Sequence, residues 1–238
     1  MFRTVRRVNI NAMNLKQLAG TRAADFVKDG MTVGLGTGST VRWTILRLGA
    51  LVGEGLKIRA VPTSEQTEKL AIEQKIPLVT FAEVRELDLT IDGADEISPF
   101  LDLIKGGGGA LLREKFVAAA SKNLIIVADE GKLSSALGSL PLPVEVVPFG
   151  WETTARRIEN LDLKWTLRMS AGKPFLTDNG NYILDCACGK IENPAGLHHE
   201  LKLLTGVIET GLFVGMASAA IVAGAGGIKM IEKGAENV

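Results

Sequence analysis

Acids, a lysine and a run of glycines are concentrated between Leu89 and Lys115. This stretch reads LTIDGADEISPFLDLIKGGGGALLREK. Its residues with proton-transfer or charge-stabilising chemistry are Asp92, Asp95, Glu96, Lys105 and Glu114. Four consecutive glycines let backbone N–H groups approach a ligand closely, and acids beside a lysine can move protons next to a carbonyl group. We therefore interpret the stretch as a candidate catalytic segment.

The acidic part of this stretch should lie at the end of a strand. Asp92, Asp95 and Glu96 follow the apolar run LDLTI. Open α/β sheets bind their ligands at the carboxyl ends of the strands, so these side chains are candidate ligand contacts. A solvated turn is the alternative interpretation, and a divalent-metal site is another. We expect no metal site, because no His lies near and Lys105 would repel a cation.

The glycine run should form a loop of backbone donors. Lys105 with the following glycines can build a nest of N–H groups suited to an oxyanion. Glu114 comes early in the next predicted helix. A surface acid is the ordinary interpretation there, because acids favour the first turn of a helix. The neighbouring acids and the glycine loop favour a role in proton transfer instead.

A second glycine-rich segment, GLGTGST, spans residues 34–40 and follows an apolar run. Backbone N–H groups at the start of the next helix favour a phosphate, and Thr37, Ser39 and Thr40 add hydroxyl donors. No Lys precedes Ser39, which excludes a Walker loop. The next strand ends in Pro-Thr-Ser rather than in a ribose-binding acid, which argues against a dinucleotide. We predict a small phosphorylated ligand, the alternative being a tight turn that binds nothing.

Other reactive side chains give weaker signals. Lys132 follows the apolar run LIIVA and could face the same phosphate, although alone it is a solvated lysine. We expect His198 and His199 on the surface. The C-x-C spacing of Cys186 and Cys188 is too tight for an easy disulfide and lacks further zinc ligands. We interpret both cysteines as strand residues in a reducing compartment.

Composition narrows the class of protein. A chain of 238 residues can bury one core, or one core plus a small satellite domain. The net charge of zero predicts no nucleic-acid partner. The longest apolar stretch, residues 211–227, is too short and too rich in Gly and Ala to span a membrane. We expect a cytoplasmic protein whose basic first residues are an extension, with Met13 as an alternative start.

Apolar periodicity predicts alternating strands and helices in the first part of the chain. The predicted elements are a helix over 14–28, a strand over 31–35, a helix to about 48, a strand over 57–61, a helix opened by a capping box of Thr63 and Gln66, strands over 78–81 and 87–91, a helix over 110–121 and a strand over 123–128. This alternation indicates a Rossmann-like α/β fold with a doubly wound, mostly parallel sheet.

The pattern changes after residue 141. Strands are predicted over 144–147, 164–169, 182–187 and 207–209, with helices over 152–160 and 195–204. The order β-α-β-β-α-β is that of a ferredoxin-like α+β domain. We therefore predict an inserted domain over 141–210, with residues 1–140 and 211–238 forming the Rossmann-like catalytic domain.

Six motifs in order closely resemble the A-type ribose-5-phosphate isomerase family. They are GLGTGST, DGADE, KGGGGALLREK, ADEGKL, PLPVEVVPFGW and TDNGNYILD. The resemblance covers residues 14–233. It implies interconversion of D-ribose 5-phosphate and D-ribulose 5-phosphate in the non-oxidative pentose phosphate pathway, no metal or cofactor, and a homodimer or homotetramer. One departure is Gly109, where family members often have Ala.

The resemblance also implies residue roles. Glu114 becomes the catalytic base, and Asp92, Asp95 and Lys105 handle ring opening and the charge of the intermediate, with Asp92 the candidate for ring opening. The residues implied in substrate binding are Lys16, Thr37, Gly38, Ser39, Thr40, Asp92, Gly93, Ala94, Asp95, Lys105, Gly106, Gly107, Gly108 and Lys132. Glu96 receives no catalytic role.

Two rival functions share some of these features. A CoA transferase or an amino-sugar-phosphate deaminase could use the same phosphate loop and α/β core, but the transferase would form a glutamyl thioester. A non-catalytic sugar-phosphate sensor would keep GTGST and would have no use for Glu114.

Overall fold

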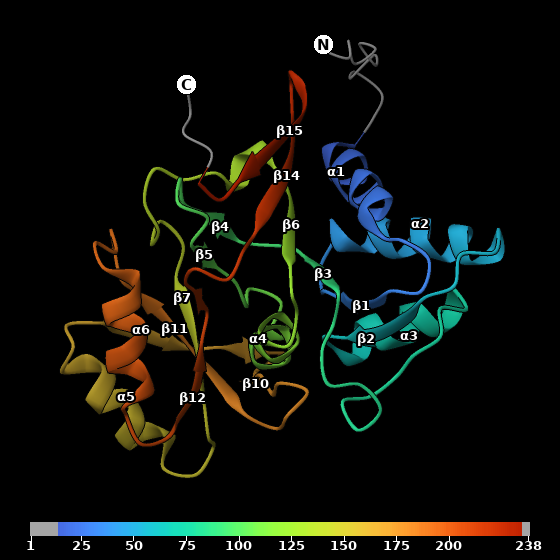
Figure 1. Cartoon of the computed structure of the whole chain (residues 1–238). Helices are drawn as coiled ribbons and strands as arrows, with labels where there is room; N and C mark the ends of the chain where they lie inside the picture. The colour runs from blue at the N-terminus through green and yellow to red at the C-terminus, as the bar shows by residue number, and fades with distance from the viewer. Residues whose placement is uncertain (1–13, 235–238) are drawn as a thin grey trace.

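A six-stranded sheet forms the centre of the protein, whose computed structural model describes residues 14–234 (Figure 1). The strands lie in the order β15 (Gly227–Glu232), β14 (Ala219–Gly224), β6 (Leu124–Asp129), β3 (Leu89–Asp92), β1 (Thr32–Leu35) and β2 (Arg59–Pro62). Neighbouring strands are parallel except for the antiparallel hairpin of β14 and β15. The predicted α/β fold with a mostly parallel sheet is confirmed.

The two faces of this sheet are covered differently. One face is covered by three helices, α1 (Leu15–Ala23), α2 (Val41–Gly53) and α3 (Glu65–Glu73). A 3₁₀ turn, η2 (Ala24–Phe26), follows α1. On the other face lies a short sheet of β4 (Glu96–Ile97), β5 (Leu103–Ile104) and β13 (Leu212–Phe213). Successive side chains of β6 explain both cores, because Ile125 and Val127 enter the first and Ile126 enters the second.

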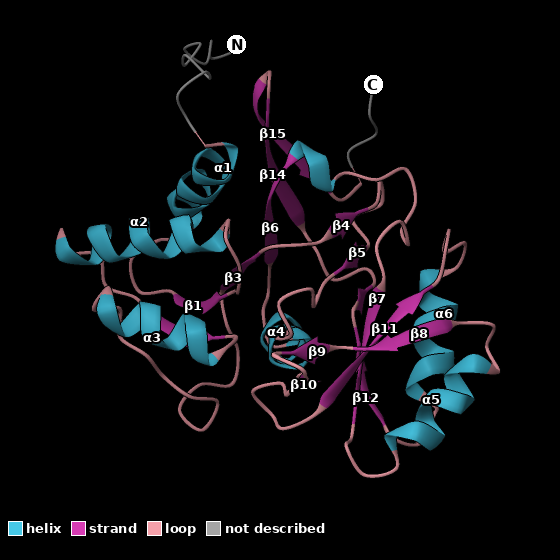
Figure 2. Cartoon of the chain, turned by 180° about the vertical axis from the view of Figure 1, so that it is seen from behind, coloured by secondary structure: helices cyan, strands magenta, loops and turns pink. Residues whose placement is uncertain are grey.

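A second sheet of four antiparallel strands lies beside the first. Its order is β12 (Val207–Thr210), β7 (Leu142–Val146), β11 (Tyr182–Ala187) and β8 (Lys164–Leu167). Helices α5 (Trp151–Glu159) and α6 (Pro194–Lys202) lie together on one side of it (Figure 2). In the sequence, an antiparallel ribbon of β9 (Met169–Ser170) and β10 (Lys173–Pro174) lies between β8 and β11. The strand order confirms the ferredoxin-like arrangement, whereas the domain boundaries at 141 and 210 stay a prediction.

Helix α4 (Leu111–Ala119) lies between the two sheets. It contacts β3 of the first sheet and both β7 and β12 of the second. Lys115 fastens it to β12, because its Nζ lies 2.8 Å from Glu209 Oε1 and 2.7 Å from the Thr210 carbonyl oxygen. Both sheets therefore hold α4 in place.

Several local predictions differ from the structure. The predicted strand over 78–81 is wrong, since only an isolated bridge joins Leu78 to Ala60 and Glu83 accepts hydrogen bonds from Thr80 in a turn. The cap of α3 is Ser64 and not Thr63. The basic segment before Met13, and Met13 itself, lie outside the described residues.

The minor predictions on His and Cys are partly right. His199 is exposed, whereas His198 is half-buried because its Nδ1 lies 2.7 Å from Thr210 Oγ1. Cys186 is buried in β11, but Cys188 lies beyond the end of that strand. Both cysteines are free thiols.

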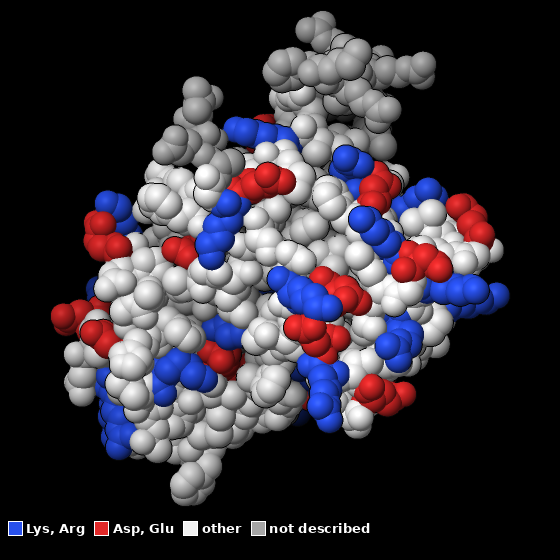
Figure 3. Space-filling model, in the orientation of Figure 1, with Lys and Arg blue, Asp and Glu red and all other residues white. Residues whose placement is uncertain are grey.

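The surface carries charges of both signs. On the face drawn in Figure 3, Lys and Arg side chains are interspersed with Asp and Glu, without a broad area of one sign. This distribution agrees with the net charge of zero. Among residues 14–234, no helix has the length and apolar character needed to cross a bilayer.

The close packing of α4 on the sheet predicts a stability effect at Gly34 in β1. A Cβ atom there would lie 1.9 Å from Thr90 Oγ1 and 2.5 Å from Val117 Cγ1. We expect Gly34→Ala to lower the free energy of unfolding by about 1–3 kcal/mol, measured by urea denaturation. Gly53→Ala is the matched control, because a Cβ at Gly53 in α2 meets no atom within 4 Å. Equal stability of the two variants would contradict this packing.

Candidate active site

A cavity of about 170 Å³ lies at the carboxyl ends of β1, β3 and β6. It is lined by Lys16, Thr37, Gly38, Ser39, Thr40, Val41, Gly93, Ala94, Asp95, Lys105, Gly106, Gly107, Gly108, Glu114 and Lys132. Because parallel strands end at the same edge of a sheet, loops far apart in the sequence meet here. The cavity brings together all the predicted site residues except Asp92, and it adds Val41.

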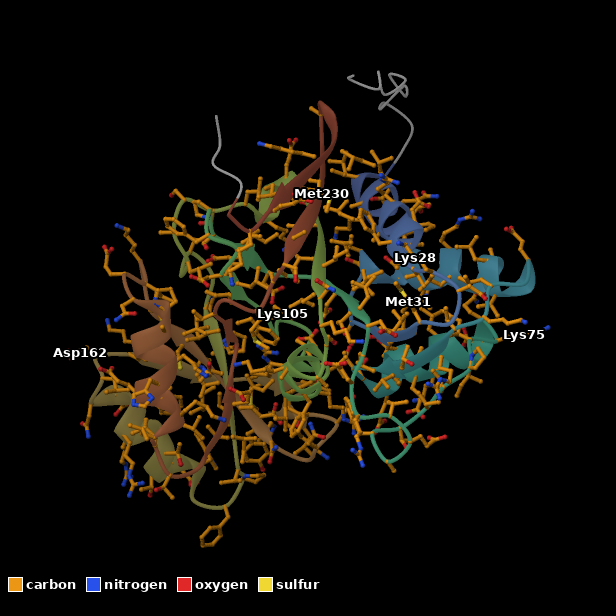
Figure 4. The ribbon with its side chains drawn as sticks, viewed as in Figure 1. Lys28, Met31, Lys75, Lys105, Asp162 and Met230 are labelled. Carbon is orange, nitrogen blue, oxygen red and sulfur yellow. The ribbon has the colours of Figure 1, made fainter. Side chains whose placement is uncertain are left out.

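A buried ammonium group lies between two buried carboxylates in the wall of this cavity. Lys105 Nζ is 3.0 Å from Asp92 Oδ2 and 3.3 Å from Glu114 Oε1. It also donates a hydrogen bond of 2.6 Å to the Gly93 carbonyl. All three side chains are at most 6% exposed, and Figure 4 places Lys105 in the interior near α4. Buried charges persist only when paired, so each member of this cluster depends on the others.

Burial shifts the protonation equilibria of the cluster. Desolvation raises the pKa of Glu114 from its ordinary 4.5 to about 8, against the attraction of Lys105 and with repulsion from Asp92. Desolvation also raises the pKa of Asp92, against Lys105. Burial would lower the pKa of Lys105, but the carboxylates of Asp92 and Glu114 outweigh it and raise that pKa. Lys105 therefore stays an ammonium, and Glu114 titrates near the pH at which a general base works best.

Glu114, Asp95 and Asp92 differ in how far a ligand could reach them. Glu114 Oε2 is buried and has no hydrogen-bond partner among the described residues. Asp95 lines the cavity, and its Oδ2 accepts a hydrogen bond of 2.8 Å from the Gly107 N–H. Asp92 is fully buried beneath Lys105 and does not line the cavity. The sequence assigns substrate contact to both aspartates, and here Asp95 faces the ligand space.

The oxygens of Asp92 are held from two sides. Its Oδ1 accepts hydrogen bonds from the Thr37 N–H at 3.1 Å and the Gly93 N–H at 2.7 Å, and its Oδ2 faces Lys105. Asp92 thereby connects the GTGST loop, the DGAD turn and the lysine. Its carboxylate fixes the position of groups that line the cavity.

The GTGST loop leaves donors for an anion. Thr40 immediately precedes α2, and its side chain makes no capping hydrogen bond. The backbone N–H groups of Gly38, Ser39 and Thr40 form no hydrogen bond with described residues. Lys16 Nζ lies 3.0 Å from Ser39 Oγ, and Lys132 enters from the 3₁₀ turn η3 (Glu130–Lys132) after β6. Free N–H groups at a helix start, beside two lysines, are suited to bind an anion.

The hydroxyl of Thr37 is not among these free donors. Its Oγ1 lies 2.7 Å from both Thr63 Oγ1 and Ser64 Oγ, and 3.1 Å from Thr67 Oγ1. The loop is thus fixed by a hydroxyl cluster at the start of α3, which the sequence argument missed. The sequence signal for this cluster is the pair Thr63 and Ser64, which directly follows β2.

Glu96 supports a neighbouring loop. Glu96 accepts hydrogen bonds from the Gly138 N–H at 2.7 Å, from the Leu140 N–H at 2.5 Å and from Ser139 Oγ. It therefore holds the loop that precedes β7.

Within residues 14–234, no three His, Cys, Asp or Glu side chains are grouped as a metal site would require. A reaction without metal stays a prediction.

Comparison with known proteins assigns the family. The chain matches the family model described as ribose 5-phosphate isomerase A (phosphoriboisomerase A) over residues 59–227. A ribose-5-phosphate isomerase A from Bacillus mycoides is 61% identical over 218 residues, which are 91% of this chain and 99% of the relative. This chain belongs to the ribose 5-phosphate isomerase A family.

Solved structures agree with this assignment. A D-ribose-5-phosphate isomerase in complex with phospho-erythronic acid has a TM-score of 0.89 and 39% identity, covering 92% of this chain and 100% of that one. The ribose 5-phosphate isomerase A of Methanocaldococcus jannaschii has a TM-score of 0.88 and 37% identity, covering 92% and 98%.

The raised pKa of Glu114 predicts a pH-dependent stability. The folded pKa of about 8 exceeds the ordinary 4.5, so the stability that protonated Glu114 contributes is present below pH 4.5 and is lost as pH rises through about 8. Glu114→Gln cannot ionise. It should match the wild type near pH 5 within about 1 kcal/mol and exceed its free energy of unfolding by more than that at pH 9.

Urea unfolding at both pH values checks this expectation. Glu68→Gln on the exposed face of α3 is the control and should follow the wild type at each pH. If Glu114→Gln and Glu68→Gln show the same pH dependence, Glu114 is not a destabilised buried carboxylate.

Proposed function

We propose that this chain interconverts D-ribose 5-phosphate and D-ribulose 5-phosphate by proton transfer through an enediolate. The observation that carries the proposal is the buried Glu114, whose free Oε2 and neighbouring Lys105 border a cavity that Lys16, Lys132 and the GTGST loop also line. Membership of the family supports the same reaction.

The phosphate end of the cavity orients the sugar. The N–H groups of the GTGST loop, with Lys16 and Lys132, bind the phosphate on C5. Binding energy from this remote group fixes the reacting carbons beside Glu114, which converts affinity into rate. The cavity size suits a single small ligand.

Two kinds of proton transfer follow. The furanose first opens, which requires proton exchange on the C1 hydroxyl and the ring oxygen. We assign this exchange to Asp95, which faces the cavity, and we assign Asp92 an indirect role through Lys105. Glu114 then removes the C2 proton and returns it to C1, while the proton of the C2 hydroxyl is transferred to O1. A positioned base contributes about 10²–10⁴-fold.

Charge stabilisation supplies the remaining acceleration. The enediolate oxygens carry negative charge, which an anionic aspartate cannot stabilise. Lys105 stays cationic because of its carboxylate neighbours, and the glycine loop adds N–H donors. One good donor at such an oxygen is worth roughly 3–4 kcal/mol.

Three further expectations belong to this proposal. The family resemblance supports a homodimer or homotetramer, and the reaction with a soluble sugar phosphate supports a cytoplasmic location. The change from parallel to antiparallel strands near β7 supports a catalytic domain of residues 1–140 with 211–238 and an inserted domain of 141–210.

The central test is a coupled assay for ribulose 5-phosphate. We expect Glu114→Gln to lower kcat by about 10²–10⁴-fold while KM changes little, because the phosphate site is untouched. Glu68→Gln should keep wild-type turnover. Wild-type turnover in Glu114→Gln would remove Glu114 from the mechanism.

The same assay separates the rival functions. A wild-type chain that forms no ribulose 5-phosphate but binds the sugar phosphate would be a sensor. A trapped glutamyl thioester with CoA would favour a transferase.

The anion site gives an independent prediction. Lys132→Met removes a charged donor from the phosphate end, and such hydrogen bonds contribute about 1.5–3 kcal/mol. We expect kcat/KM to fall about 10–100-fold, mainly through KM, with weaker inhibition by inorganic phosphate. Lys122→Met is the control, since Lys122 pairs with Glu86 and Asp88 away from the cavity. An unchanged KM in Lys132→Met would remove Lys132 from the site.

A further inference from the structure

Arg168, between β8 and β9, links the glycine loop of the cavity (residues 106–109) to the second sheet by hydrogen bonds. Its Nη1 donates hydrogen bonds to the carbonyl oxygens of Gly106 at 3.0 Å and Gly107 at 3.1 Å. Its Nε and Nη2 donate to the two oxygens of Asp185 at 2.9 and 2.5 Å. The side chain is 16% exposed. A planar guanidinium held by a carboxylate in this way has one orientation.

The direction of these carbonyls determines the direction of the N–H groups that follow them. In a trans peptide the C=O and the next N–H point in opposite directions. The Gly106 carbonyl points to Arg168, and the Gly107 N–H accordingly donates to Asp95 Oδ2 at 2.8 Å. The Gly107 carbonyl also points to Arg168, so the Gly108 N–H points away from it. That N–H has no partner among the described residues, and Gly108 lines the cavity.

The far end of the loop packs against the same part of the second sheet. Gly109 has a φ of +84°, and a Cβ there would lie 2.5 Å from the Phe175 ring. The Arg168 Cζ lies 5.8 Å from the centre of that ring, and the Phe175 N–H donates to the Arg168 carbonyl at 2.8 Å. The absence of a side chain at Gly109 therefore lets Arg168 and Phe175 support the loop together.

We propose that Arg168 is a positioning residue of the isomerase site. By holding the Gly106 and Gly107 carbonyls, it directs the Gly107 N–H to Asp95 and leaves the Gly108 N–H for the oxyanion that develops on the substrate. This role rests on the proposed function, because the oxyanion forms in the isomerase reaction. Arg168 itself does not line the cavity and acts through the loop.

A second arginine provides a matched control. Arg113 on α4 also joins the two parts of the fold, since its Nε donates to Asn179 Oδ1 at 3.1 Å and its Nη2 to the Asp178 carbonyl at 2.8 Å. Arg113 makes no hydrogen bond to the glycine loop. Loss of either guanidinium removes contacts across the same interface, and only loss of Arg168 frees the loop carbonyls.

The experiment compares Arg168→Met, Arg168→Lys and Arg113→Met in the assay for ribulose 5-phosphate. Two inhibitors are measured with each variant. A phosphorylated four-carbon aldonic acid carries a carboxylate where the enediolate oxygens form, and inorganic phosphate reports on the anion site alone. Thermal unfolding shows that each variant is folded at the assay temperature.

We expect Arg168→Met to lower kcat by about 10²–10³-fold, the effect of losing one oxyanion donor, with KM changed less than about threefold. Affinity for the aldonic acid should fall, whereas inhibition by inorganic phosphate stays unchanged. Arg168→Lys keeps the charge and should recover part of kcat. Arg113→Met should reduce thermal stability and keep the wild-type ratio of the two inhibition constants.

Two results would overturn this role. One is wild-type kcat in Arg168→Met, and the other is an equal loss of kcat and of aldonic-acid affinity in Arg113→Met. The wild type and Glu114→Gln in the same assay separate this failure from that of the proposed function. An inactive wild type overturns the isomerase, whereas an active wild type with an active Arg168→Met overturns the role of Arg168 only.

Discussion

The ion cluster of Lys105 with Asp92 and Glu114 is the constraint on which the rest of the site depends. Two carboxylates and one ammonium are buried together, which is costly unless the geometry is fixed. The surrounding backbone fixes it, since Asp92 accepts hydrogen bonds from N–H groups of two loops and Lys105 donates a hydrogen bond to the Gly93 carbonyl. The two carboxylates keep Lys105 charged, whereas burial, together with repulsion from Asp92, raises the pKa of Glu114 to about 8 against the attraction of Lys105.

The second sheet contributes to this site without supplying an acid or base. Its turn at residues 177–181 contacts both helices that support the cavity. Asp178 Oδ2 accepts a hydrogen bond of 2.8 Å from the Glu65 N–H at the start of α3, and Arg113 of α4 binds the same turn. The buried Glu145 holds the turn through Thr177 and Asn181. The second sheet and its loops therefore contact α3, α4 and, through Arg168, the glycine loop.

Much of the site could be predicted because its motifs directly follow apolar runs. Thr37, Asp95 and Lys132 each follow a parallel strand, and the ends of such strands meet whatever their separation in sequence. Predictions failed where a neighbour decided the outcome. The segment 78–81 has the composition of a strand, but hydrogen bonds between Thr80 and Glu83 hold it in a turn. The Thr37 hydroxyl looks free in the sequence, but the start of α3 occupies it.

The sequence by itself determined the fold class and the loops that line the cavity, because strand periodicity and glycine spacing are local properties. The resemblance to the family named Glu114 as the candidate base. Only the tertiary structure decided that Asp92 lies beneath the cavity while Asp95 faces it, since the sequence places both acids at the end of β3 and does not show what packs against each. It also decided the pKa of Glu114, which arises from burial among groups distant in the chain. The role inferred for Arg168 has the same origin, because no motif brings residue 168 near residues 106 and 107; the packing of the two sheets does.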